Sequence, residues 1–250
     1  ETQRVALLEQ EADLFKIKER AIENARKAGL HVVLAVTTAK GVNDHQLWDI
    51  IHYALRKKLN GVNFQPFAMQ GRYPQSQLDP LNRITNPDVA RLVEVQSGGL
   101  IRADDFIPIP CPDHRCQTLC YLSVDEKRAI PVNRLIEVEG ILDYYKNFTD
   151  PDQMESAVKD LRKTLYDMWS SSAVPGRVEE ACCNLLPQTG ANFFPISCHA
   201  MMDVLNVDIH RLERCCIHEL TRDGRLIPFC LYNYTSINGQ TLYRNNTATL

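Results

Sequence analysis

The chain has 250 residues, enough to bury a substantial core in one large domain or two small ones. Its hydrophobic share of 44%, charged share of 24% and formal net charge of −3 are ordinary for a globular protein and give no support to nucleic-acid binding. No apolar run approaches the roughly 20 residues that a membrane-spanning helix needs, and no signal peptide is visible. We therefore expect a cytoplasmic protein, with association to a membrane surface left open.

The first 66 residues alternate between helical and strand patterns. Apolar residues at helical spacing predict helices over 13–28 and 45–58, and β-branched apolar runs predict strands over 31–38 and 61–66. Short connections between such elements are typical of parallel strands with right-handed crossovers. The sequence therefore predicts an α/β fold in which the two strands lie parallel and adjacent.

Polar side chains stand at the end of each predicted strand: Thr37 in the first, and Asn63 and Gln65 in the second. In α/β folds the polar side chains at the carboxyl ends of strands usually face the functional site. We expect all three to point towards one shared cavity. The alternative, at about even odds for each, is that they only satisfy the backbone of the loops.

Further elements follow with weaker patterns. Asn43 or Asp44 is expected to cap the second helix, and Asn86-Pro87 is expected to begin a third that runs through Val95. Helices are also predicted over 134–147 and 151–169.

All nine cysteines lie from position 111 onward. Their odd number, their two Cys-Cys pairs and the lack of a secretory signal argue against a disulfide framework. One group is I-P-C-P-D-H-R-C-Q-T-L-C, residues 109–120, and the other is R-C-C-I-H followed by L-I-P-F-C, residues 214–230. A turn at Arg222-Asp223-Gly224-Arg225 is expected to fold Cys230 back beside Cys215 or Cys216. One pair of thiolates from each group would supply the four ligands that zinc or an iron–sulfur cluster commonly takes.

These spacings alone are weak signals, because free cysteine is among the most buried residue types. Cys182 and Cys183 are more naturally core thiols, and Cys198 is balanced between the two interpretations. His199 and His218 could ligate a metal, but a hydrogen-bonding role is favoured at least twofold.

The run A-I-E-N-A-R-K-A-G-L-H-V-V-L-A-V-T-T-A-K-G-V-N-D, continuing to G-V-N-F-Q-P, resembles the later half of a radical S-adenosylmethionine (radical SAM) barrel. The two cysteine segments, I-P-C-P-D-H-R-C and C-C-I-H-E-L-T-R-D-G-R-L-I-P-F-C-L-Y-N, resemble one branch of that superfamily. This branch contains the archaeal tetraether lipid synthases and pterin methyltransferase-like proteins. The resemblance covers residues from about 13 to 235.

The resemblance implies the second half of a partial (β/α)6 radical SAM barrel in residues 1–105. A cysteine-rich, mostly helical region in residues 106–250 would follow and carry an auxiliary [4Fe-4S] cluster. It favours four cluster ligands, Cys111, Cys116, Cys215 and Cys230. Cys120, Cys198 and Cys216 stand in reserve, in that order, and His218 and Arg225 are expected to donate to the sulfurs. Thr37, Asn63 and Gln65 would contact S-adenosylmethionine or substrate.

Radical SAM enzymes reductively cleave S-adenosylmethionine with a cluster on a C-x3-C-x2-C loop, and this motif does not occur in the 250 residues. Together with the first residue, Glu1, this leads us to expect a piece of a longer enzyme that is inactive alone. No catalytic residue is assigned.

The expected reaction is radical C–H activation, either carbon–carbon coupling or methyl transfer, on a bulky and possibly lipidic substrate. A ferredoxin or flavodoxin would serve as the reductant. Two alternatives are a non-catalytic metal- or cluster-binding module, used for structure or electron transfer, and an inert half-barrel that packs against a partner chain.

Overall fold

A computed structural model describes residues 14–71, 79, 81–109, 113–124, 129–134, 192–236 and 238–243. Two predicted helices lie outside the described residues, except for Arg134 at the start of the first: 134–147 and 151–169. Three cysteines also lie outside them: Cys111, Cys182 and Cys183. The first elements are α2 (Leu14–Lys27), β1 (Val33–Thr38), α3 (Leu47–Arg56), β2 (Gly61–Pro66) and α4 (Asn86–Gln96).

The elements that follow are mainly strands. They are η2 (Ala103–Asp105), β3 (Ile107–Pro108), β4 (Gln117–Val124), β5 (Ala129–Pro131), η3 (Val132–Arg134), β6 (Asn192–His199), α8 (Ile209–Glu213), β7 (His218–Leu220), β8 (Leu226–Pro228) and α9 (Phe229–Tyr232).

The two predicted helix–strand units are confirmed. β1 pairs with β2 in parallel, with Thr37 opposite Gln65 and Ala35 opposite Asn63. The main sheet has the order β1-β2-β6-β4-β3, and β5 pairs with β4. β6 is parallel to β2 and antiparallel to β4, so strands from both sides of residue 105 share one sheet.

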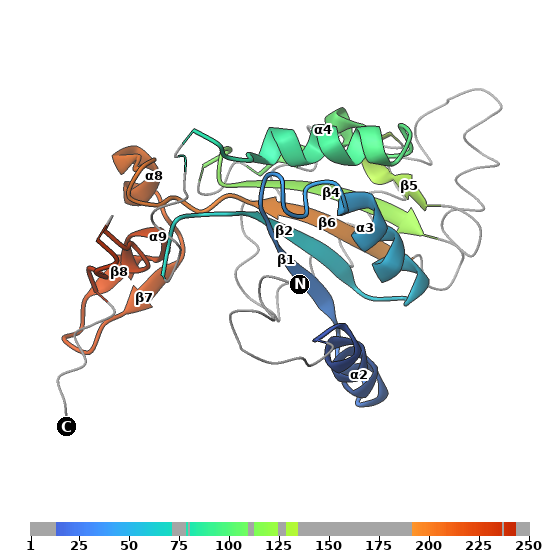
Figure 1. Cartoon of the computed structure of the whole chain (residues 1–250), viewed down its shortest axis with the longest axis horizontal. Coiled ribbons are helices and arrows are strands. Elements are labelled where there is room, and N and C mark those ends of the chain that lie inside the picture. Colours follow the sequence, from blue (N-terminus) through green and yellow to red (C-terminus); the bar gives the residue numbers. More distant parts are fainter. Residues whose placement is uncertain are drawn as a thin grey trace, which may run out of the picture.

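The core lies between the sheet and the two helices α3 and α4, which cover the same face of the sheet (Figure 1). Leu47 and Ile51 of α3 and Val89 and Val93 of α4 are fully buried against the strands. The strand residues of this core come from β2, β6 and β4 and alternate along each strand, as expected for one buried face; they are Val62, Phe64, Phe194, Ile196, Cys198, Cys120 and Leu122.

The start of α3 is capped from outside its own sequence. The predicted cap at Asn43 or Asp44 is wrong, since the N-cap is Gln46, which makes no side-chain capping bond. Gln96, at the end of α4, accepts a hydrogen bond from the backbone N–H of Trp48 at 3.2 Å and donates to the carbonyl of Asp44 at 2.6 Å. Asn43 instead bridges Thr37 and Ala39 in the loop after β1. The two helices over the sheet are thus joined by a polar contact at their ends.

A buried carboxylate fixes the loop after β2 to the C-terminal segment. Asp203 is fully buried and accepts hydrogen bonds from the backbone N–H groups of Met69, at 2.7 Å, and Leu205, at 3.0 Å. The Arg83 guanidinium donates to both of its oxygens, at 2.7 and 2.9 Å. Burial alone would raise the pKa of Asp203, but Arg83 and the backbone donors outweigh it and hold that pKa below its usual range.

α8, α9 and the β7–β8 hairpin gather beyond the carboxyl ends of β2 and β6 (Figure 1). Gln70 donates to the carbonyl of Met202 at 2.6 Å, and Gly71 donates to Thr235 at 2.7 Å. These contacts and Asp203 hold the C-terminal elements at the edge where polar side chains were predicted to meet.

None of the described helices is both long and apolar enough to cross a bilayer.

Candidate functional site: a polar sheet face beside a cysteine cluster

The face of the sheet that α3 and α4 do not cover carries a group of polar side chains beside apolar ones such as Ala35, Leu119 and Pro195. Its side chains alternate with the core residues, and the strand register places them in adjacent rows. We call this surface the polar wall; its members are Thr37, Asn63, Gln65, Ser197, His199 and Gln117.

The three site residues predicted on β1 and β2 all lie on this wall. Thr37 is exposed, whereas Asn63 and Gln65 are half-buried. Thr37 and Gln65 stand opposite each other, and Asn63 lies two residues before Gln65 on the same strand face. The Oδ1 atom of Asn63 is sealed from solvent and has no hydrogen-bond partner among the described residues.

Ser197 and His199 complete the wall, and the sequence interpretation did not assign them to it. Ser197 stands opposite Asn63 in the β2–β6 ladder, and His199 stands opposite Gln117 in the β6–β4 ladder. The signal was present in the sequence, because residues 194–199 alternate between core and wall positions in the period of a strand.

His199 is a neutral hydrogen-bonding group. Burial, and then the nearby positive charge of Arg211, lower the pKa of its imidazole below the usual value. Near neutral pH the ring therefore carries one N–H donor and one acceptor nitrogen.

Three of the predicted ligand cysteines come together beyond the wall. As predicted, the turn at 222–225 joins β7 and β8 in an antiparallel hairpin. This hairpin, with a 2.9 Å backbone bond from Phe229 to Ile217, returns the chain towards Cys215. Burial raises the pKa of Cys230, and repulsion from Cys215 and Cys116 raises it further. We call Cys116, Cys215 and Cys230 the cysteine cluster.

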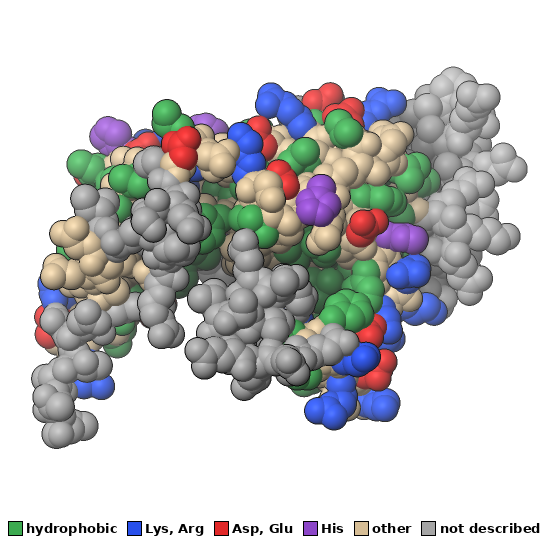
Figure 2. Space-filling model, viewed as in Figure 1, with side chains coloured by type: hydrophobic (Ala, Val, Ile, Leu, Met, Phe, Trp, Pro, Cys, Tyr) green, Lys and Arg blue, Asp and Glu red, His purple; other side chains and the backbone are tan. Residues whose placement is uncertain are grey.

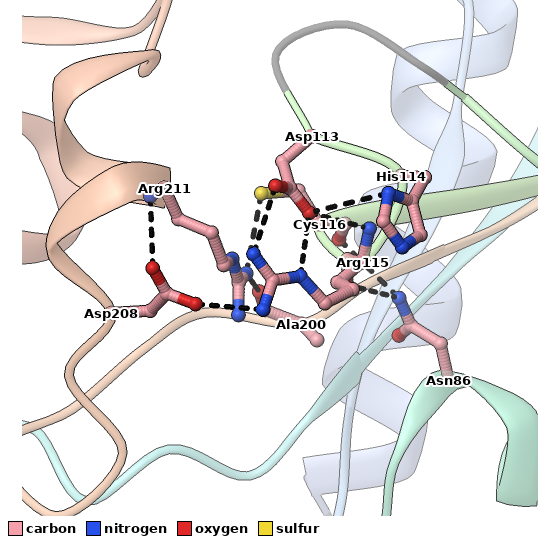
Figure 3. A network of polar contacts seen from close by, with 8 residues as sticks. All are labelled: Asn86, Asp113, His114, Arg115, Cys116, Ala200, Asp208 and Arg211. Atoms are coloured by element: carbon pink, nitrogen blue, oxygen red, sulfur yellow. Dashed lines mark hydrogen bonds and ion pairs between the residues drawn. The ribbon is translucent and has the colours of Figure 1, made fainter.

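The loop that carries Cys116 is held rigidly by its neighbours (Figure 3). The Arg115 guanidinium donates to both oxygens of the buried Asp113, at 2.9 and 3.0 Å, and to Asp208 at 2.7 Å. These bonds outweigh burial and hold the pKa of Asp113 well below its usual range. The side-chain amide of Asn86 donates to the carbonyls of Arg115 and Cys116, each at 3.3 Å. The Cys116 sulfur is therefore presented by a loop with little freedom to move.

Arg211 is the positive group at the cysteine cluster. Its Nη2 atom donates to the Cys116 sulfur at 3.2 Å and to the carbonyl of Ala200 at 3.1 Å. Asp208 caps the short helix that carries Arg211, accepting from its backbone N–H at 3.1 Å. The Arg211 guanidinium thus joins the Cys116 loop to the segment that follows β6.

The expected donors His218 and Arg225 are placed elsewhere. His218 is exposed on β7, and Arg225 donates to Asp223 at 2.7 Å within the turn. Arg211 takes the role that was expected of them. It precedes Cys215 by four residues, but no spacing rule in the sequence distinguishes it from the other arginines.

The reserve cysteines separate into two environments. Cys120 and Cys198 are fully buried in the core on neighbouring strands, and burial raises the pKa of both thiols, that of Cys198 to about 12. Cys216 is exposed. Cys111 lies outside the described residues.

Two sulfurs of the cysteine cluster, those of Cys116 and Cys230, lie near the Arg211 cation, and sulfur ligands of this kind suit a soft metal centre. Within the described residues, no three Cys, His, Asp or Glu side chains are arranged to hold a single metal ion. The three thiols nevertheless lie close enough for each charge to affect Cys230.

The surface seen in Figure 2 carries no large area of one charge. Basic and acidic side chains are interspersed over α4 and around α2. On this face, the described residues thus offer no strongly basic or acidic area that would bind a polyanion or polycation.

Comparison with known proteins gives one informative similarity, whereas no protein-family model matches the chain. The chain is 33% identical, over 263 aligned residues, to the 7,8-dihydro-6-hydroxymethylpterin dimethyltransferase of Methanocaldococcus jannaschii. The alignment covers 88% of this chain and 52% of that protein, so the chain spans about half the length of the curated relative that it matches. The similarity supports the expected relationship to the radical SAM superfamily, through its pterin methyltransferase-like branch.

Proposed function

We propose that this chain is the later half of a radical SAM methyltransferase that transfers methyl groups to a pterin. The observation that carries the proposal is the 33% identity to a pterin dimethyltransferase, which extends over 88% of the chain. A pterin replaces the lipid that the sequence suggested as a possible substrate, because the matched relative acts on a pterin. The parallel strands β1, β2 and β6, with helices on one face and polar residues on the other, suit half of a radical SAM barrel.

In this proposal the polar wall forms the inner surface on which the cofactor and substrate lie. β1 is at one end of the described sheet, so strands supplied by an earlier part of the protein would add beside it. Thr37, on β1, is then nearest to S-adenosylmethionine, with Asn63 and Gln65 on the next strand. The wall residues bind and orient the reactants, and the strands beneath them keep these positions fixed.

The cysteine cluster would hold an auxiliary [4Fe-4S] cluster, with Cys116, Cys215 and Cys230 as ligands and Cys111 as the fourth. Such a cluster, when bound, supplies one-electron transfer. The chain itself contributes the rigid loop at Cys116, the cation of Arg211, and the N–H of Met202, which donates to the Cys230 sulfur at 3.5 Å. A ferredoxin or flavodoxin is the expected electron donor.

The test of activity uses the full-length protein, reconstituted anaerobically with iron and sulfide. It is mixed with S-adenosylmethionine, dithionite and 7,8-dihydro-6-hydroxymethylpterin, and the products are identified by mass spectrometry. We expect a pterin that is heavier by one or two methyl groups, together with cleavage of S-adenosylmethionine. Cleavage with an unchanged pterin would overturn the substrate assignment. If iron binds but nothing is cleaved, the protein is instead the non-catalytic metal- or cluster-binding module.

The metal assignment has its own test. Serine replacement of Cys116, Cys215 or Cys230 should lower the iron and sulfide content of the reconstituted protein and weaken its visible absorbance. Cys216→Ser is the matched control, since Cys216 adjoins Cys215 in sequence but is exposed. Equal iron content in all four variants would refute the ligand set.

A further inference from the structure

The most informative atom on the polar wall is the Oδ1 of Asn63. It is inaccessible to solvent and accepts no hydrogen bond from the described residues. Buried acceptors are almost always paired, since an unpaired one loses its hydrogen bond to water without replacement. A donor from a bound ligand that displaces the atoms covering Oδ1 would supply the missing hydrogen bond, which makes this atom the candidate ligand contact on the wall.

The neighbours of Asn63 in the ladders are uncharged, and Ala35 on β1 stands opposite it. Ser197 stands opposite Asn63 in the ladder, Gln65 and Thr37 lie in the next row, and His199 follows Ser197 on the same strand face. His199 is neutral near pH 7, so this part of the wall offers hydrogen-bond donors and acceptors without a net charge. Such a surface favours an uncharged heteroaromatic ring with a hydrogen-bonding edge over an anionic ligand.

Asn63 lies on β2, which has β1 on one side and β6 on the other. β6 runs from Ser197 and His199 directly into Ala200, whose carbonyl accepts from Arg211 at the cysteine cluster. Asn63 and Ser197 therefore stand between β1 and the cysteine cluster. If S-adenosylmethionine lies near β1, a second ligand would lie over β2 and β6.

We propose that Asn63, flanked by Ser197 and His199, binds the pyrimidinone edge of the dihydropterin and determines its selection. This edge carries a ring N–H beside a carbonyl, and a side-chain amide can pair with both at once through its oxygen and its NH₂ group. The ring N–H would donate to the unpaired Oδ1. The assignment rests on the proposed function and names, within it, the side chain that recognises the substrate.

The experiment measures binding rather than turnover. The full-length protein is titrated with 7,8-dihydro-6-hydroxymethylpterin, and separately with S-adenosylmethionine, without reductant. Asn63→Ala should raise the pterin Kd about tenfold or more, as expected when a ligand N–H loses its buried partner. Its Kd for S-adenosylmethionine should stay within about twofold. Asn24→Ala, at an exposed amide on α2, is the matched control and should change neither.

A second measurement does not depend on the folding of a variant. The wild-type protein is titrated with the same pterin methylated at the ring nitrogen N3, which lacks the N–H of that edge. We expect its Kd to rise by about the same factor as for Asn63→Ala.

Four results would count against the assignment. Unchanged pterin binding by Asn63→Ala, tight binding of the N3-methyl pterin, or a loss confined to S-adenosylmethionine would each overturn it while leaving the proposed function in place. A wild-type protein that binds no pterin would overturn the proposed function itself.

Discussion

Replacing Arg83 by methionine removes the guanidinium that pairs with the buried carboxylate of Asp203. Methionine keeps the apolar stem of arginine but ends short of the guanidinium, so the change removes the charge, the two hydrogen bonds to Asp203 of 2.7 and 2.9 Å, and the 3.7 Å contact to the Met69 sulfur. Asp203 would keep its backbone donors at Met69 and Leu205 but would stand fully buried without a counter-ion. We expect Arg83→Met to destabilise the protein strongly without changing the sheet.

The magnitude follows from the burial of the pair. Breaking a buried ion pair by removing one partner costs about 3–5 kcal/mol, because the remaining charge loses its compensation. Two backbone N–H donors still stabilise the carboxylate, so we expect Arg83→Met to lower the free energy of unfolding by about 3 kcal/mol, the lower end of this range. Arg91→Met is the matched control: its side chain is 72% exposed and lies 3.9 Å from Asp88. An exposed pair of this kind contributes about 0–1 kcal/mol.

The free energy of unfolding is measured by urea denaturation, followed by circular dichroism, at several pH values. In the wild type the pKa of Asp203 is lower in the folded state than the roughly 3.9 of an unfolded aspartate. The stabilisation that the ionised Asp203 carboxylate gains in the folded state is therefore present above pH 4 and is lost as the pH falls through the folded pKa of Asp203. The difference between wild type and Arg83→Met should be large at pH 7 and smaller at pH 3. An Arg83→Met variant within 1 kcal/mol of Arg91→Met at pH 7, or a difference that grows in acid, would refute the reasoning.

Three further predictions concern the fold around the site. Gly61 has φ +153°, and an added Cβ would lie 2.8 Å from the Cγ and carbonyl oxygen of Pro195. Gly61→Ala should therefore cost about 2–3 kcal/mol in urea unfolding, and a neutral effect would contradict the β2–β6 packing. Gln96→Ala should lower the free energy of unfolding by about 1 kcal/mol, because α3 loses its cap, whereas Gln46→Ala should leave it almost unchanged. A larger loss for Gln46→Ala would show that α3 is capped by its own N-cap residue. Cys198, with its pKa raised to about 12 by burial, should resist iodoacetamide in the native protein at pH 8 and react in urea, as peptide mass spectrometry would reveal. Modification at equal rates in both states would place that thiol at the surface.

The helices and strands of the first hundred residues could be predicted because their signals are local. Periodicity indicates a helix over 45–58, which the structure has as Leu47–Arg56, and the strand at 61–66. Asn86-Pro87 marks the start of α4, and the structure shows a capping box at Thr85. The parallel pairing of β1 and β2 follows from the short crossover between them. In this part of the chain, the residues that give the sequence signal are the same residues that form the helix or strand.

Contacts between distant segments could not be predicted in this way. The cap supplied by Gln96 joins residues 48 positions apart, and the donor to Cys116 is Arg211, 95 positions away. Ser197 and His199 become part of the wall only because β6 pairs with β2, more than 130 residues earlier in the chain. Such partners depend on topology, which no local spacing encodes.

The place of β6 in the sheet has a consequence for how the chain folds. β6 lies between β2 and β4, although it follows both of them in sequence. Until β6 is in place, the β1–β2 unit and the β3–β4–β5 unit have no strand to join them. β6 closes the sheet, and its pairing with β2, more than 130 residues earlier in the chain, makes this step slow compared with the formation of either unit. During synthesis on the ribosome both units would wait with unpaired edges, which are the surfaces most prone to aggregation.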